Sequence, residues 1–151
     1  KAAEMCETNL EQNSNHMELL RNRLLSNLRS LLDDGNGSDS LEDTTSTSVV
    51  VRDNGPKNPL HRLPNTLSVG IQNIQSHILL ATLKNSVAAS AGAACHSSGS
   101  GSSISSVLVA MQVPDSFARG TLRLSIGPLT TIDEIDNASR IIADAAKEQR
   151  K

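Results

Sequence analysis

Residues 121–134 read TLRLSIGPLTTIDE and carry the two patterns that decide the fold. From Thr121 to Ile126, leucine and isoleucine alternate with polar residues, which predicts a strand with one face in the core and Arg123 on the other face. Thr131 and Glu134 have the spacing of a capping box, in which two side chains satisfy exposed backbone N–H groups at a helix start. A strand that leads into a capped helix predicts an α/β domain.

The flanking sequence contains further elements of both kinds. Its apolar spacing predicts strands over 49–52, 67–71 and 87–91, and helices over 78–83, 104–111 and 131–147. In the second of these helices, one face carries Ile104, Val107, Leu108 and Met111. The last helix is predicted from the spacing of Ile135, Ala138, Ile142 and Ala145. Several connections are too short for a crossover helix, so we expect mixed strand directions. The predicted fold class is α/β, or layered α+β, with a mixed sheet flanked by helices.

The N-terminal segment predicts one long helix over about residues 3–32. Apolar residues three and four positions apart form one stripe of Met17, Leu20, Leu24, Leu28 and Leu31, widened by Leu19, Leu25 and Leu32. The polar residues between them are expected on a solvated face without a chemical role: Glu18, Arg21, Arg23, Asn27 and Arg29. Because a single helix cannot bury its stripe against itself, this helix must pack on another part of the protein.

A change in composition marks residues 33–48, which are rich in acidic and hydroxyl residues and contain no basic residue. Acid clusters can bind calcium, but the alternating acids and the terminal glutamate of a calcium loop are missing. We interpret the segment as a flexible acidic linker.

The length, net charge and composition of the chain exclude several classes of function. The 151-residue chain is the size of one domain, and its formal net charge of −2 offers no basic surface to nucleic acid or to an anionic membrane. Phe117 is the only Phe, Tyr or Trp of the chain, so nucleic-acid bases would find almost no aromatic side chain on which to stack. The two cysteines form no disulfide framework, and the sequence has neither a signal peptide nor a membrane-spanning apolar run, so we expect a cytoplasmic protein. The chain begins with Lys1 and not with Met, which indicates an excerpt of a longer protein.

Residues 90–106 read SAGAACHSSGSGSSISS and place Cys95 between a run of small residues and a glycine-serine tract. A structural cysteine normally lies in an apolar run, whereas this setting is typical of a thiol on an accessible loop. The alternative is an ordinary surface loop with an incidental cysteine. His96, beside Cys95, lacks zinc-ligand spacing with His61 or His77, so no metal site is predicted. The glycine-serine tract lacks the Gly-Lys-Ser/Thr ending of a phosphate loop and is better interpreted as a hinge.

Four motifs occur in an order that resembles one family. They are HRLPNTL at 61–67, ASAGAACHS at 89–97, SVL at 106–108 and ARGTLRLSIG at 118–127, the last followed by Thr130 and Thr131. The chain resembles the C-terminal domain of the selenocysteine lyases, in the class V aminotransferase-like group that also contains the cysteine desulfurases. The GAACHS piece favours the lyases, whereas RLPNT and Arg-x-Ser-x-Gly are shared with the desulfurases.

The resemblance implies that residues 1–151 form the single small C-terminal domain of a fold-type I pyridoxal phosphate enzyme. In this division 3–32 is the interdomain helix, 33–48 is an insertion and 49–151 is the small domain with the cysteine loop. The cofactor would be held by a large N-terminal domain absent from the sequence, because no lysine here has the histidine-lysine setting of the family. No cofactor-binding residue is therefore assigned. Gln112, at a position where relatives usually have glycine, and Pro128 depart from the family pattern.

The activity that the resemblance implies is removal of selenium from L-selenocysteine, which leaves L-alanine. Cys95 would be the catalytic nucleophile that carries the chalcogen, and Arg123 would bind the substrate carboxylate through its bidentate guanidinium. The implied partners are the missing N-terminal domain, the amino-acid substrate, a second copy in a homodimer, and a selenium or sulfur acceptor protein. The chain alone is expected to be inactive. Two alternatives stay open: a cysteine desulfurase that donates persulfide sulfur, and a noncatalytic remnant or interaction domain of the same fold.

Overall fold

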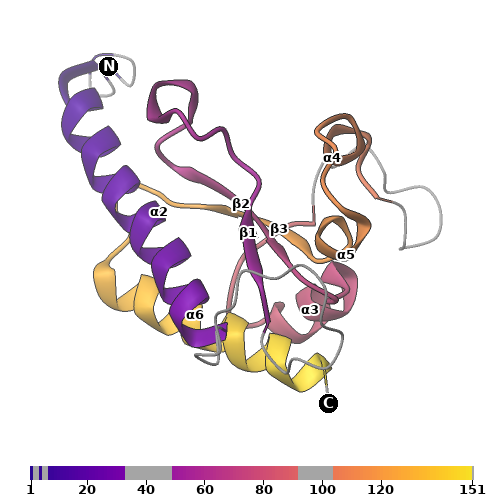
Figure 1. Cartoon of the computed structure of the whole chain (residues 1–151). Helices are drawn as coiled ribbons and strands as arrows, with labels where there is room; N and C mark the ends of the chain where they lie inside the picture. The colour runs from indigo at the N-terminus through magenta and orange to yellow at the C-terminus, as the bar shows by residue number, and fades with distance from the viewer. Residues whose placement is uncertain (2–3, 5–6, 33–48, 92–103, 151) are drawn as a thin grey trace.

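The computed structural model describes residues 1, 4, 7–32, 49–91 and 104–150, which form a sheet flanked by helices (Figure 1). The acidic linker predicted at 33–48 lies outside these residues. The strands are β1 Val51–Asp53, β2 Thr66–Ile71 and β3 Thr121–Ser125, in the order β1-β2-β3. The helices are α2 Leu10–Leu32, α3 Ser76–Leu83, α4 Ser106–Ala110, α5 Asp115–Ala118 and α6 Ile132–Gln149, with a 3-10 turn at Pro59–His61.

The predicted α/β class is confirmed, but the described strands do not run in mixed directions. β1 pairs with β2 and β2 pairs with β3, both antiparallel. The connection from β2 to β3 is long enough for a crossover, but it returns the chain to the edge of β2 in the opposite direction. It contains α3, α4, α5 and an isolated antiparallel bridge between Ser90 and Arg123. That bridge is all that forms of the strand predicted over 87–91.

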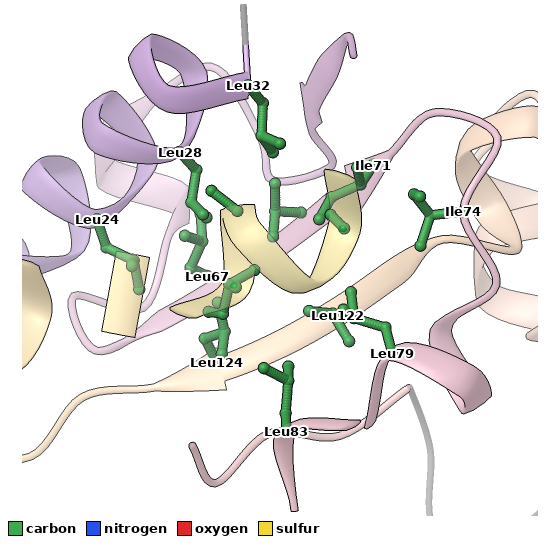
Figure 2. Close-up of a cluster of buried hydrophobic side chains, with 14 of the residues drawn as sticks. Leu24, Leu28, Leu32, Leu67, Ile71, Ile74, Leu79, Leu83, Leu122 and Leu124 are labelled. Atoms are coloured by element: carbon green, nitrogen blue, oxygen red, sulfur yellow. The ribbon is translucent and has the colours of Figure 1, made fainter. Parts of the chain in front are cut away.

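One face of the sheet forms the core together with α2 and α6, and Figure 2 shows leucines of α2 directed at Leu67 of β2. The buried stripe of α2 is Leu20, Leu24, Leu28 and Leu32, each at most 3% exposed. The predicted stripe is therefore mostly confirmed, but Leu19 is 57% exposed, because the contact with the sheet follows the row of every fourth residue. Glu4, Glu7 and Thr8 are helical, close to the predicted start near residue 3, but a turn at Asn9 separates them from α2, which begins at Leu10.

The capping box at the start of α6 is confirmed. The Thr131 backbone N–H donates to Glu134 Oε2 at 2.8 Å, and the Glu134 backbone N–H donates to Thr131 Oγ1 at 3.3 Å. Of the four residues that predict this helix, Ile135 and Ile142 are buried, and Ala138 and Ala145 are half-buried. The buried residues of α6 are Ile135, Ser139, Ile142, Ala143 and Ala146. The buried face is wider than one stripe because α6 packs against both α2 and α3.

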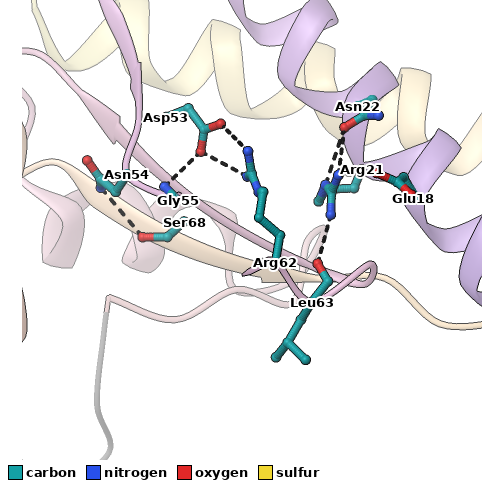
Figure 3. A network of polar contacts seen from close by, with 9 residues as sticks. All are labelled: Glu18, Arg21, Asn22, Asp53, Asn54, Gly55, Arg62, Leu63 and Ser68. Carbon is teal, nitrogen blue, oxygen red and sulfur yellow. Dashed lines mark hydrogen bonds and ion pairs between the residues drawn. The ribbon is translucent and has the colours of Figure 1, made fainter. Parts of the chain in front are cut away.

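Arg21 lies in the interior and not on the solvated face predicted for it. The residue is 3% exposed. Its guanidinium donates to the Leu63 carbonyl at 2.8 Å, to Glu18 Oε1 at 2.9 Å and to Asn22 Oδ1 at 3.0 Å (Figure 3). A buried charge is tolerated when it is paired and hydrogen-bonded, and these acceptors meet both conditions.

Arg23 and Asn27, also predicted on the solvated face of α2, join this helix to α6. Arg23 Nε and Nη2 donate to the two carboxylate oxygens of Asp136, each at 2.7 Å, and Asn27 Nδ2 donates to Asp136 Oδ1 at 2.8 Å. These hydrogen bonds, first from Arg23 and then from Asn27, lower the pKa of Asp136 from 3.8 to about 2.

The replacement Asp136→Asn is expected to remove part of the acid dependence of stability. Because the folded pKa of Asp136 is depressed, its stabilising contribution is present above pH 3.8 and is lost as pH falls through about 2. The midpoint of urea unfolding should fall less steeply between pH 4 and pH 2 in the variant than in the parent. Asp144→Asn, at an exposed position of the same helix, is the control and should keep the parental slope. Equal slopes in all three proteins would contradict this assignment.

α4 ends in a Schellman motif centred on Gln112, which has a left-handed φ of 53°. The Val113 backbone N–H donates to the Leu108 carbonyl at 3.0 Å, and the Gln112 N–H donates to the Val109 carbonyl at 2.9 Å. Val113 and Leu108 also pack together in a small second core. The helix predicted over 104–111 is thus shorter, and Val107 and Met111 are 59% and 47% exposed, whereas Leu108 is the buried residue of α4.

The replacement Gln112→Gly is expected to stabilise the fold by about 1 kcal/mol, because glycine adopts a left-handed φ without the steric cost that a Cβ imposes. The matched control is Ala110→Gly, at the exposed last residue of α4, where glycine should cost up to about 1 kcal/mol. Urea denaturation of the two variants should therefore shift in opposite directions. A shift of both variants to lower stability would contradict the left-handed conformation.

Candidate functional site

The face of the sheet that turns away from the core is polar and partly open. The strand residues on it are Arg52, Thr66, Ser68, Gly70, Thr121, Arg123 and Ser125. α5 covers one end of this face, so tightly that a Cβ on Gly70 would lie 3.0 Å from the Phe117 carbonyl oxygen. Figure 1 places α4 and α5 on the side of the sheet opposite α2.

Four polar residues form one row across this face, which we call the Arg123 row. Asn54 follows β1 and donates its backbone N–H to the Ser68 carbonyl at 2.9 Å. Ser68 is the cross-strand partner of Arg123, and Arg123 exchanges two backbone hydrogen bonds with Ser90. Directly paired residues of antiparallel strands place their side chains on the same face about 5 Å apart. Asn54, Ser68, Arg123 and Ser90 are therefore neighbours although they come from separate parts of the sequence.

Arg123 is exposed and leaves the core face, as the alternation in β3 predicts. Among the described residues, no hydrogen bond or ion pair reaches its guanidinium, whereas Arg21, Arg23 and Arg62 are each paired with a carboxylate. An arginine fork has a fixed planar geometry that matches a carboxylate or a phosphate. The Arg123 row can therefore bind an anionic group.

Cys95, the predicted nucleophile, and His96 lie outside the described residues. The described chain before them ends at Ala91, next to the bridge between Ser90 and Arg123. Five residues of chain extend over at most about 18 Å, which limits how far Cys95 can be from Ser90. The β3 pairing therefore fixes Arg123 and the start of the cysteine segment at the same place.

The loop between β1 and β2, which leads into the Arg123 row, is anchored by an ion pair that is not evident from the sequence (Figure 3). Arg62 donates to the two carboxylate oxygens of Asp53 at 2.7 and 3.0 Å, and Asp53 Oδ1 also accepts the Gly55 backbone N–H at 3.0 Å. Arg62 belongs to the HRLPNTL motif, and this motif could have pointed to a role for Arg62. Its partner Asp53 becomes evident only when β1 is placed beside β2.

Neither a metal centre nor a membrane span is found in the part of the chain that the structure describes. Within it, no group of three or more His, Cys, Asp or Glu side chains could hold a metal ion. In the same residues, no helix has both the length and the apolar character needed to cross a membrane.

Comparison with curated proteins finds relatives among cysteine desulfurases and selenocysteine lyases. The Clostridium botulinum cysteine desulfurase IscS is 28% identical over the whole of this chain, which covers 34% of that protein. A cysteine desulfurase of Azospirillum brasilense is 43% identical over 86 residues, or 56% of this chain and 21% of the relative. The human selenocysteine lyase is 46% identical over 77 residues, or 50% of this chain and 17% of the relative. No family model matches the chain.

Solved structures lead to the same group of proteins. A NifS-like protein superimposes with a TM-score of 0.66 and 27% identity over 93% of this chain, which covers 30% of that structure. A NifS-like protein of Rickettsia africae has the same fold, with a TM-score of 0.61. The chain thus spans about a third of the length of the curated relatives it matches throughout. The sequence and the fold together relate this chain to the cysteine desulfurase and NifS-like group, as a part equivalent to about a third of those proteins.

Proposed function

We propose that the complete protein removes sulfur from L-cysteine in a pyridoxal phosphate-dependent reaction, and that this chain supplies the sulfur-accepting thiol and the carboxylate-binding arginine. The Cys95 thiolate would attack the substrate sulfur, forming a sulfur–sulfur bond while the substrate carbon–sulfur bond breaks. The electron pair of the broken bond stays with the substrate carbon, which takes up a proton and leaves as L-alanine. An acceptor thiol, on a partner protein or a small molecule, would then remove the persulfide sulfur, and we propose a homodimer as the assembly.

The observation that carries this proposal is the position of Arg123. Its exposed fork, which has no partner within the described residues, stands on β3, and its backbone pairs with Ser90, from which the chain leads to Cys95. A reaction at the side chain of a small amino acid needs two groups: one that binds the carboxylate and one nucleophile that reaches the sulfur.

Pyridoxal phosphate is proposed to be held elsewhere in the complete protein. Lys1 is at the N-terminus, Lys57 lies in the loop after β1, Lys84 caps α3 and Lys147 lies on α6, so none of these lysines belongs to the Arg123 row. The described residues therefore do not fit a covalent anchor for the cofactor. Bound elsewhere, the cofactor would supply stabilisation of the negative charge that develops on the substrate.

L-selenocysteine is the second candidate substrate. The GAACHS sequence around Cys95 favours it, and so does the 46% identity to a selenocysteine lyase over half of the chain. The chemistry required of Cys95 and Arg123 is the same for both amino acids.

The test is alanine formation by the complete protein from L-cysteine and, separately, from L-selenocysteine. Arg123→Lys is expected to lower kcat/KM by about 100-fold, because an ammonium cannot replace two parallel charge-assisted hydrogen bonds. Arg29→Lys, at an exposed position of α2, is the control and should behave like the parent. No alanine from either substrate would refute the function, and full activity of Arg123→Lys would refute the role of Arg123.

A further inference from the structure

Ser68 lies beside Arg123 at the end of a chain of hydrogen bonds that starts in the interior. Thr121 Oγ1 donates to the Phe117 carbonyl at 3.0 Å, and Asn54 Nδ2 lies 3.1 Å from Thr121 Oγ1. A hydroxyl group has one proton to donate, and Phe117 receives it, so Thr121 Oγ1 must accept from Asn54. This contact sets the orientation of the buried Asn54 amide.

The oriented amide then determines the direction of the next hydrogen bond. Asn54 Nδ2 lies 3.5 Å from Ser68 Oγ, the contact drawn in Figure 3. An amide NH₂ group only donates, so Ser68 Oγ accepts here and keeps its own hydroxyl proton for another acceptor. Asn54 flanks Ser68 on one side of the row and Arg123 flanks it on the other. The hydroxyl proton of Ser68 is therefore available to an acceptor on the face of the sheet that carries Arg123.

Asn54 is also a residue that the stability of the fold alone does not explain. The residue is 5% exposed, and its Oδ1 is buried without a hydrogen-bond partner among the described residues. A buried polar atom without a partner destabilises a fold, so its presence calls for another explanation. Fixing the direction of the Ser68 hydroxyl is such an explanation.

We propose that Ser68 is a second binding residue for the substrate carboxylate and that Asn54 and Thr121 are its positioning residues. The Ser68 hydroxyl donates to one carboxylate oxygen of the amino acid while Arg123 holds the carboxylate through its fork. The ligand class is an α-amino acid with a free carboxylate, and the inference rests on the proposed function.

The experiment measures KM and kcat for L-cysteine, in the complete protein loaded with its cofactor, for four variants. Ser68→Ala should raise KM about tenfold and leave kcat within about twofold, because a hydrogen bond to the bound carboxylate is lost at every stage of the reaction. Ser68→Thr keeps the hydroxyl and should stay within about threefold of the parental KM. Thr121→Val should raise KM at least about threefold, because Asn54 loses the contact that orients it. Ser86→Ala, an exposed position after α3, is the matched control and should leave both constants unchanged.

Three outcomes would overturn the inference while leaving the proposed function intact. They are a parental KM for Ser68→Ala in an enzyme that forms alanine, a fall in kcat without a change in KM, and equal impairment of Ser68→Thr and Ser68→Ala. Failure of the unsubstituted protein to form alanine would overturn the proposed function and this inference with it. The unsubstituted protein therefore separates the two failures.

Discussion

Cys95→Ala in the complete protein is expected to reduce alanine formation from L-cysteine by at least about 1,000-fold. A methyl group cannot form the sulfur–sulfur bond, and no positioning effect of the remaining residues replaces a covalent carrier. Cys6, the only other cysteine of the chain, lies in the N-terminal segment, far in sequence from the Ser90 bridge that leads to Cys95. The measurement is alanine released per enzyme molecule under saturating substrate.

Cys6→Ala is the matched control, since it removes a thiol from the same chain, and it should retain parental turnover. Mass spectrometry after one turnover without an acceptor thiol should find a persulfide on the Cys95 peptide of the parent and of Cys6→Ala. Alanine formation by Cys95→Ala at the parental rate would remove this residue from the mechanism. It would also restore the interpretation of Cys95 as an incidental cysteine on a surface loop.

The elements that the sequence predicted correctly are those whose determinants are local. Alternation alone predicted β3 and the outward position of Arg123, since residues two apart share a face whatever the partner strand is. The capping box between Thr131 and Glu134 joins residues three apart, so no knowledge of the rest of the fold was needed.

The errors arise where distant segments decide the outcome. Arg21 was assigned to a solvated face because of its charge, but its burial depends on the Leu63 carbonyl, 42 residues away. Asp136 gains its depressed pKa from α2, more than a hundred residues earlier. A periodic pattern in one helix contains neither of these partners.

One part of the candidate site could be predicted from local sequence, and another part depends on distant segments. Arg123 could be singled out from its strand, but the Arg123 row could not, because it depends on strand register. A shift of one residue in the pairing of β2 with β3 would place Ser68 beside a core leucine instead of Arg123. The relation of Asn54 to Ser68 likewise appears only when β1 and β2 are aligned.

Gly120 supports this register, and Gly120→Ala is expected to destabilise the fold by at least about 3 kcal/mol. A Cβ at this position would overlap the Ile71 carbonyl oxygen and lie 3.0 Å from the Ile74 carbonyl oxygen. Both are backbone atoms, which cannot rotate away as a flexible side chain can. The Gly120 carbonyl also accepts the Ile71 backbone N–H at 3.1 Å, so relief of the overlap would separate β2 from β3 where the two strands begin to pair.

Gly127→Ala provides the matched control for this prediction. The nearest atom to a Cβ on Gly127 is Thr130 Oγ1 at 3.7 Å, an ordinary contact distance, so the free energy of unfolding should change by no more than about 1 kcal/mol. The chain has no tryptophan or tyrosine, so urea unfolding should be followed by far-ultraviolet circular dichroism. Equal stability of the two variants would mean that the contact between the end of β2 and the start of β3 can shift without a loss in the free energy of unfolding. Because β3 carries Arg123 and pairs with Ser90, a contact that shifts so easily could not keep the Arg123 row aligned for a substrate carboxylate.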